Sequence, residues 1–339
     1  MLHREWISYD DQLQDQRWKT KRQEILQRDN HMCQMCSSKG SLDNPLEVHH
    51  RYYLYPSYAW QYNSDALITL CARCHTLIHL TISPLSYAYN QKRELVIMNF
   101  TPCIRCLGAG YFREYKHVEN GICFRCRGER FEELIDKKEI IIIDNFINHN
   151  DKIFDNSQKQ LPSIEIIEKE EKTKDNFKIG VGYLEGKYGY PKDEFKAKSY
   201  LYEAAINGHK EAQYELANII LLDKETIKNI KNRKDALRWF VYAAMKGHRL
   251  APKFIAAMLR TGIVDNQSDF YADEWERINC INEDDEPICI NTGIAVAIAY
   301  NKPQLIHTYK RRLDDLAAKG NKMAIALLES SKDIYNKYC

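Results

Sequence analysis

The sequence predicts a multidomain α+β protein, in which two small cysteine-rich units precede an all-α region of helical repeats. Three observations support this prediction. Four Cys-x-x-Cys pairs lie before residue 127, the chain of 339 residues is too long for one typical core, and an alanine-rich helical pattern recurs after residue 176. We therefore expect domains at residues 1–92, 93–135 and 176–339, with a linker at 136–175.

The composition is that of an ordinary soluble protein, and the cysteine usage favours a cytoplasmic location. Charged residues make up 28% and hydrophobic residues 44% of the chain, and the net charge of +2 permits nucleic-acid contact without predicting it. No run reaches the ~18 apolar residues that a membrane span needs, and no secretory h-region follows the first residues. Most of the 11 cysteines fall into Cys-x-x-Cys pairs, which indicates metal thiolates in a reducing compartment.

An amphipathic helix is expected over residues 9–28. Trp18 and Ile25 belong to its apolar side, and several basic residues alternate with them. The basic side can lie on phosphates, or it can be the solvated side of a packing helix. The candidate nucleic-acid contacts on this helix are Arg17, Lys19 and Arg22.

Two cysteine pairs predict a first structural zinc site. Two such pairs, separated by an intervening segment, are the usual way to close a tetrahedral zinc site. The zinc would join the entry of a β-hairpin to the start of the helix that follows it. The four predicted ligands are Cys33, Cys36, Cys71 and Cys74.

A group of histidines lies between and after these cysteines. The segment containing His49 and His50 alternates as a strand does, so the two rings should point to opposite faces. His75 and His79 are spaced i,i+4 on one helical face, the spacing that two imidazoles need to reach one cation. If His49 faces that helix, a site of two or three imidazoles with open positions results. His50 is then free to act as a base.

These residues together resemble the H-N-H endonuclease family, also called the ββα-metal or His-metal finger fold. The resemblance covers about residues 8–80, and the whole string is far more specific than any of its parts. The string contains Trp18-x-x-x-Arg22, Arg28-Asp29, Cys33-x-x-Cys36, Leu46–His50 and Leu67–His79. It implies a phosphodiester hydrolase acting on DNA, or on RNA, with His50 as the general base. It also implies that His49 and His79, with His75 as a third candidate, hold one catalytic Mg²⁺, Mn²⁺, Ni²⁺ or Zn²⁺.

One position departs from the family pattern. The family asparagine usually precedes the Leu-x-x-Leu-Cys string, and Ala66 occupies that place here. Asn63 or Asp65 can substitute for it, and Asp65 can equally cap the next element. An alternative to the enzyme is therefore a non-catalytic adaptor, whose degenerate finger binds nucleic acid and whose repeats bind a protein.

An aromatic segment at residues 51–62 links the histidine pair to the second cysteine pair. Arg51 adjoins the expected base, where a fixed cation can stabilise the developing phosphorane charge. Tyr52 can stack on a base of the substrate. Aromatic residues in such a segment more often fill the core of a small domain.

A second structural zinc site is predicted further along the chain. Glycines follow each of its cysteine pairs, where they relieve the tight turns. The Cys-x-x-Cys-x-Gly-x-Gly form resembles half of the zinc domain of J-domain co-chaperones. No J-domain signature precedes it, so the resemblance implies only the geometry of a zinc hairpin. The module can grip a duplex through its basic residues, or it can be a purely structural spacer. The predicted ligands are Cys103, Cys106, Cys123 and Cys126, and the basic residues are Arg105, Arg113, Lys116, Arg125, Arg127 and Arg130.

The C-terminal part contains an internal repeat. The pattern Ala-x-x-Gly-x-x-x-Ala occurs at 205–212, 244–251 and 317–324. Small residues at this spacing let two helices approach closely, and the glycine suits the turn between them. Over residues 176–330 the pattern resembles Sel-one-like repeats of the tetratricopeptide type, which implies a solenoid that binds a protein partner. His209 and His248 would be structural residues of the turns, and the oligomeric state stays open, with a dimer as one option.

Smaller expectations complete the sequence-based prediction. A strand is expected at residues 95–100, after an irregular connector at 81–92. The acidic run at 283–286 is expected to be a solvated loop. The cysteines outside the pairs, which are expected to be buried free thiols, are Cys280, Cys289 and Cys339.

Overall fold

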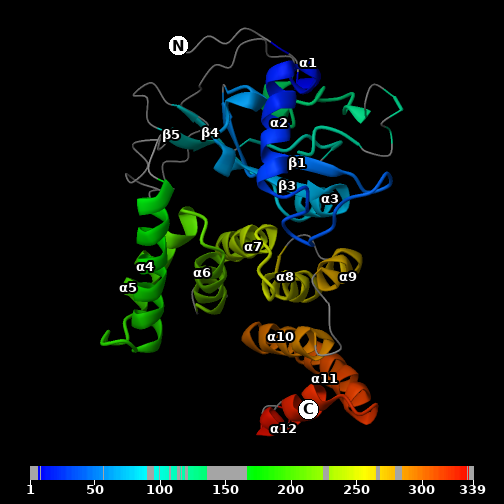
Figure 1. Cartoon of the computed structure of the whole chain (residues 1–339). Helices are drawn as coiled ribbons and strands as arrows, with labels where there is room; N and C mark the ends of the chain where they lie inside the picture. Colours follow the sequence, from blue (N-terminus) through cyan, green and yellow to red (C-terminus); the bar gives the residue numbers. More distant parts are fainter. Residues whose placement is uncertain are drawn as a thin grey trace. The chain divides into compact units, whose positions relative to one another are not determined.

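A computed structural model describes residues 7, 9–55, 57–89, 95–98, 100–106, 108–112, 115, 117–118, 121–135, 166–223, 229–264, 268–278, 285–333 and 335. The chain divides into two compact units, Met1–Ile164 and Glu165–Cys339. The first combines small sheets with helices and the second contains helices (Figure 1), which confirms the mixed α and β class. Both predicted cysteine-rich domains lie within the first unit. Among the described residues, no helix has the length and apolar character that crossing a membrane requires.

The centre of the first unit is an antiparallel strand pair followed by a helix. β1 (Leu46–His50) pairs with β3 (Leu67–Cys71), and α3 (Ala72–Thr81) begins directly after β3. Every residue of β3 is buried, as expected of a strand that is covered on both faces. The strand pair and α3 therefore place the histidine pair and the later histidines in one small structure.

The predicted helix over residues 9–28 is in fact two helices. α1 (Tyr9–Gln14) ends one residue before Asp15, and α2 (Gln16–Arg28) begins directly after it. Asp15 has an extended backbone, with φ −63° and ψ 139°, and its carboxylate accepts a hydrogen bond from the Arg17 amide. A carboxylate in this position is a strong N-cap, which starts a new helix where the periodicity alone predicts a continuous one.

A second sheet covers another part of the first unit. β2 (Tyr52–Tyr55) runs parallel to β4 (Leu85–Tyr89), and β4 is antiparallel to β5 (Leu95–Met98). β5 confirms the strand expected at residues 95–100, whereas β4 corrects the connector expected at 81–92. The inward residues of β4 include Ser86 and Ala88, 3% and 1% exposed, which are too small or too polar to give a hydrophobic alternation. The short 3₁₀ helices in the described part of this unit include η1 (Ala59–Gln61), η2 (Ser64–Ala66) and η5 (Glu132–Leu134).

The second unit is helical, and its helical pairs are consistent with repeats. Glycines with positive φ, at 86°, 75° and 86°, separate α5 from α6, α7 from α8 and α11 from α12 at Gly208, Gly247 and Gly320. These are the glycines of the three recurrences in the sequence. The helices are α4 (Ile166–Glu185), α5 (Glu194–Ile206), α6 (Lys210–Leu222), α7 (Ile230–Met245), α8 (Ala251–Arg260), α9 (Asp269–Arg277), α10 (Asp285–Ala299), α11 (Pro303–Ala318) and α12 (Lys322–Ser330).

The side chain of the residue after each turn glycine accepts a hydrogen bond from the first turn of the helix that follows. Nδ1 of His209 accepts a hydrogen bond from the Ala212 amide at 3.2 Å, and Nδ1 of His248 accepts one from the Ala251 amide at 3.2 Å. Asn321 does the same in the last pair, through the Ala324 amide at 2.9 Å. His209 is therefore the N-cap of α6, whereas His248 bonds the first residue of α8, whose N-cap is Leu250, and both histidines stabilise the turns, in agreement with their expected structural role.

Some expectations fall on other parts of the chain. The predicted linker at 136–175 lies outside the described residues up to 165, and α4 occupies the rest of it from Ile166. Cys280 and Cys339 also lie outside the described residues, as do the first two residues of the acidic run, while the last two begin α10. Cys289 is buried, at 5% exposed, as predicted.

The close approach of α10 and α11 depends on Gly293. A Cβ atom at this position would lie 2.5 Å from Cζ of Tyr309, a side chain that is 3% exposed. We expect Gly293→Ala to lower the free energy of unfolding of the helical unit by about 1–3 kcal/mol, because overpacking forces one helix to shift. Denaturant unfolding measures this loss. In a Tyr309→Ala background the same substitution should cost much less, and an equal cost in both backgrounds would contradict the close approach.

Candidate metal centre and active site

The first two cysteine pairs meet in a four-thiol cluster. The sulfur atoms of Cys33, Cys36, Cys71 and Cys74 lie within 4.8 Å of one another. Sγ of Cys36 is 3.7 Å from Sγ of Cys71, far from the ~2.05 Å of a disulfide and close to the ~3.8 Å edge of a zinc tetrahedron with Zn–S bonds of about 2.3 Å. The donor set fits zinc.

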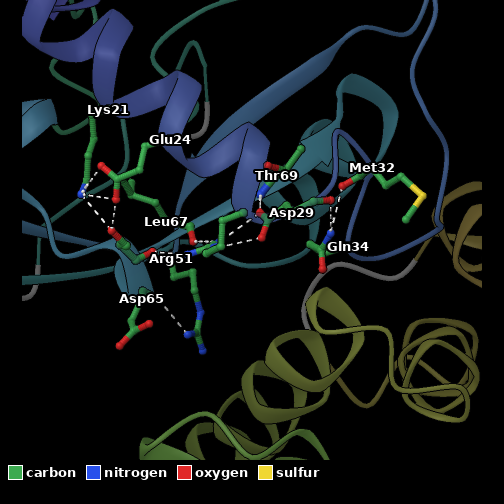
Figure 2. A network of polar contacts seen from close by, with 11 residues as sticks. Lys21, Glu24, Asp29, Met32, Gln34, Arg51, Asp65, Leu67 and Thr69 are labelled. Carbon is green, nitrogen blue, oxygen red and sulfur yellow. Dashed lines mark hydrogen bonds and ion pairs between the residues drawn. The ribbon is translucent and has the colours of Figure 1, made fainter. Parts of the chain in front are cut away.

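The end of α2 fixes the strand that leads into this cluster. Oδ2 of Asp29 accepts a hydrogen bond from the Thr69 amide at 2.8 Å, and Figure 2 shows this carboxylate reaching the backbone of β3. Nη2 of Arg28 donates to the Leu67 carbonyl at 2.9 Å, and the backbone amide of Gln34 donates to the Thr69 carbonyl at 2.9 Å. Arg28 and Asp29 thus hold β3 in register with the first cysteine pair.

Three imidazoles converge on one face of the strand pair and α3. The ring of His49 meets the rings of His75 and His79 edge to face, with centroids 4.8 Å and 5.1 Å away. Nε2 of His79 is 3.2 Å from Nε2 of His75, close to the ~3.3 Å that separates two nitrogen ligands of a tetrahedral ion with bonds of about 2.0–2.1 Å. One potential ligand atom of each residue lies within 4.8 Å of the others. The structure therefore brings all three candidate metal ligands together.

The electrostatics of these rings suit a cation. Burial lowers the pKa of His49 and of His79 well below the usual value for histidine. Both rings are then neutral at pH 7, the state in which a ring nitrogen can bind a metal ion. Nδ1 of each is buried and has no hydrogen-bond partner among the described residues. Buried polar atoms of this kind are rare, and a bound ion at Nδ1 of His49 would satisfy that atom, whereas His79 would bind the ion through its Nε2.

A carboxylate that the sequence analysis missed orients one of these rings. Oε2 of Glu47 lies 2.6 Å from Nδ1 of His75, and their side chains are 24% and 12% exposed. Metal-binding histidines usually make such a hydrogen bond through the nitrogen that does not face the ion. Glu47 lies two residues before His49 on β1, so both side chains point to the same face. The two-residue spacing between Glu47 and His49 was the sequence signal that could have predicted this role of Glu47.

His50 lies on the opposite face of β1, as the alternation of a strand predicts. It is 4% exposed, its ring stacks on Trp18 at 5.3 Å, and the Tyr62 ring meets it edge to face at 4.6 Å. Nε2 is 3.4 Å from the Ala59 carbonyl oxygen. Burial lowers the pKa of His50 to about 3, so the ring is neutral at pH 7. The structure therefore separates His50 from the three converging imidazoles and packs it among aromatic residues.

The residues around the missing family asparagine form a hydrogen-bonded turn. Nη1 of Arg51 donates to the Asp65 carbonyl at 3.2 Å, and Figure 2 shows the Arg51 side chain extending toward Asp65. The Arg51 amide donates to the Ala66 carbonyl at 2.9 Å, and the Ala66 amide donates to the Asn63 carbonyl at 3.0 Å. Backbone groups therefore close this turn.

The expected nucleic-acid contacts are placed in different environments. Arg17 is paired with Asp15 at 2.7 Å and lies over the Trp60 ring at 4.0 Å, yet its side chain is 58% exposed. Arg22 donates to the Leu46 carbonyl at 2.9 Å, which ties α2 to the start of β1. Lys19 is exposed on α2. The half-buried Tyr52 packs against Tyr62 and Tyr87, with ring centroids 6.2 Å and 5.7 Å away.

The second set of cysteines forms another four-thiol cluster. Sγ of Cys103 is 4.0 Å from Sγ of Cys123, and Sγ of Cys106 is 3.6 Å from Sγ of Cys126. All four residues are buried, and all four sulfur atoms lie within 4.8 Å of one another. The geometry again fits a tetrahedral zinc site. Of the basic residues expected to grip a duplex, Arg113 and Lys116 lie outside the described residues, Arg125 pairs with Glu132 at 2.6 Å, and Arg130 is 7% exposed.

Comparison with known proteins gives a match over part of the chain. A family model described as HNH endonuclease matches residues 33–80, which include both cysteine pairs of the first cluster and the three converging histidines. No curated protein matches the chain. HNH nucleases use divalent metal ions. Residues 33–80 are therefore similar to an HNH endonuclease domain, and this similarity indicates a nuclease-type hydrolase acting on nucleic acid.

Proposed function

We propose that the protein is a metal-dependent HNH endonuclease that hydrolyses phosphodiester bonds of DNA. The convergence of three imidazoles on one point, inside the segment that the family model matches, is the observation that supports this function best. The four-thiol cluster at the start of α3 would hold zinc and fix two of these imidazoles. The helical unit would act as a repeat scaffold, a solenoid that binds a protein partner.

The proposed site assigns a separate task to each residue. His49, His75 and His79 would hold the divalent ion, and Glu47 would orient His75 through its hydrogen bond. The bound ion would supply electrophilic stabilisation of the charge that develops on the phosphate oxygens. Arg51 would add a positive charge beside the substrate.

His50 would accept the proton of the attacking water. In the described state its pKa of about 3 makes it a weak base, because its ring is fully desolvated. A phosphate brought near the ring favours the protonated form and so raises this pKa. Substrate binding would therefore strengthen the base, and the same ring would be a weak base in the free protein.

We expect His50→Ala to lower the cleavage rate by about 10²–10⁴-fold, the range typical of a lost general base. Cleavage of supercoiled plasmid with Mg²⁺, Mn²⁺ or Ni²⁺ measures this, and an RNA substrate run in parallel decides between the two nucleic acids. His117→Ala, which changes an exposed histidine, is the matched control. Undiminished cleavage by His50→Ala would exclude His50 as the base.

A second candidate function is a zinc-dependent nucleic-acid adaptor without catalysis. Two observations favour it: Ala66 replaces the family asparagine, and His50 packs in an aromatic cluster. The metal content distinguishes the two functions. The enzyme should hold two tight zinc ions and a third, exchangeable ion, whereas the adaptor should hold two zinc ions and cut neither DNA nor RNA.

A further inference from the structure

We propose that the second cysteine cluster completes the histidine centre, with Tyr111 as a positioning residue for His75. This inference rests on the metal site of the proposed function. We call residues 100–135 the second zinc module. Its zinc would then be a structural requirement of the candidate active site, although the ligands of the two sites lie far apart in the sequence.

Tyr111 reaches directly into the histidine centre. Its hydroxyl donates to Oε2 of Glu47 at 2.8 Å and lies 3.1 Å from Nδ1 of His75. The same Glu47 oxygen is 2.6 Å from Nδ1 of His75. The three groups form a closed triangle on the side of His75 that faces away from Nε2, the nitrogen nearest to His79. Tyr111 therefore limits where the Glu47 carboxylate, and with it the imidazole, can lie.

The backbone of Tyr111 is held by the cysteine cluster of its own module. The preceding Gly110 donates from its amide to Sγ of Cys106 at 3.2 Å and accepts a hydrogen bond from the Cys123 amide at 2.9 Å. Tyr111 itself forms a bridge with Ile122. Its position thus depends on both cysteine pairs, which a zinc ion would hold together.

Arg130 fixes the module against the nuclease part of the same unit. Its guanidinium lies between two rings, 3.9 Å from the centroid of Tyr9 and 4.4 Å from that of Tyr53. The side chain is 7% exposed. Phe131 adds an edge-to-face contact with the Tyr53 ring, at 6.2 Å. A buried cation between two aromatic faces and an adjoining aromatic contact make this a packed interface.

The second zinc module has two equivalent halves, and Arg130 occupies the place that a glycine has in the other half. Gly110 and Arg130 occupy equivalent places after their cysteine pairs: the Gly110 carbonyl accepts from the Cys123 amide, and the Arg130 carbonyl accepts from the Cys103 amide. Both residues have positive φ, 81° and 71°. Glycine adopts this conformation freely, whereas an arginine is strained in it. The stacking of the Arg130 side chain offsets this strain, which explains an arginine at a glycine position.

The test measures metal binding at the histidines in the full-length protein with both zinc sites loaded. Co²⁺ titrated into this protein reports the histidine site through d–d absorption, without the thiolate charge-transfer bands of cysteine sites. We expect Tyr111→Phe to weaken Co²⁺ binding by about 10-fold or more and to shift the absorption bands, as for lost outer-shell partners. Tyr115→Phe, an exposed tyrosine of the same module, is the matched control and should bind as the wild type does.

A double-mutant cycle separates positioning from a general loss of structure. Because Tyr111 acts through Glu47, adding Tyr111→Phe to Glu47→Gln should weaken Co²⁺ binding little further. Unchanged affinity and absorption in Tyr111→Phe would overturn the inference, as would full additivity of the two losses. Absence of a third metal site in the wild type would instead overturn the proposed function. Zinc content should remain at two ions in every variant, and loss of zinc from Tyr111→Phe would also count against a positioning role.

Discussion

Replacing His79 by alanine is expected to remove the third metal ion and the cleavage of DNA together, while both cysteine clusters keep their zinc. His79 supplies one of the three converging nitrogens, and its Nε2 lies 3.2 Å from that of His75. Without His79, two imidazoles would remain and water would occupy the other coordination positions of the ion. The affinity for the metal ion should therefore fall steeply. Loss of the electrophile should lower the cleavage rate by on the order of 10³-fold or more, equivalent to several kcal/mol of transition-state stabilisation.

Plasmid cleavage and metal analysis of dialysed protein measure these two effects side by side. Thr76→Ala is the matched control, because Thr76 is exposed on the same helix. Restoring cleavage in His79→Ala by millimolar Mn²⁺ would agree with a weakened site. Wild-type cleavage at low metal concentration would show that His79 is not a ligand of the working ion.

The clustering of the candidate metal ligands could be predicted from the sequence because it depends on short spacings. Two cysteines separated by two residues form a knuckle in many contexts, and two histidines at i,i+4 share one helical face. The alternation of a strand also separates His49 from His50, and the structure shows the two rings in different environments. These inferences need only local geometry, which the sequence encodes directly.

The partners of these ligands could not be predicted in the same way. Tyr111 meets Glu47 across 64 positions of the chain and His75 across 36. No periodicity links residues at such separations, since only the packing of the second zinc module on the first brings them together. The alternation of the strand places Glu47 on the same face of β1 as His49, but it does not indicate that Tyr111 contacts Glu47.

Surface charge was equally ambiguous in the sequence. Arg22 and Arg17 both belong to the basic side of the expected helix, yet Arg22 donates to the Leu46 carbonyl and Arg17 pairs with Asp15. A basic side chain that is solvated, one that contacts a phosphate and one that joins two backbone segments all have the same sequence pattern. Their distinction depends on which carbonyl or carboxylate the fold brings within reach.

Ala66 illustrates a change that the backbone absorbs. The turn at this position is closed by the Ala66 amide on the Asn63 carbonyl and by the Arg51 amide on the Ala66 carbonyl. Neither bond needs a side chain at residue 66, so the shape of the turn survives the loss of the family asparagine. What the alanine cannot supply is a polar side chain to contact His50, whose Nε2 instead lies 3.4 Å from the Ala59 carbonyl oxygen.

Cys74→Ser is expected to remove the first zinc and to unfold the small unit around it, a larger structural effect than any histidine substitution. Structural zinc contributes an apparent ~10–16 kcal/mol to the folding of small zinc domains, more than a unit with two short sheets can replace. Zinc content should fall to one ion or fewer, and limited proteolysis should degrade residues before 165 while the helical unit stays resistant, since the two are separate compact units.

Cys289→Ser, a buried thiol of the helical unit outside the clusters, is the control and should retain two zinc ions. Two tightly bound zinc ions in Cys74→Ser would show that Cys74 is not a zinc ligand. The position of Cys74 connects the expected loss of zinc to the function of the histidine centre. It directly precedes His75 on α3, and Cys71 forms the N-cap of that helix. The zinc would therefore fix the helix that presents two of the three imidazoles, so that losing it would remove the histidine centre without touching a histidine.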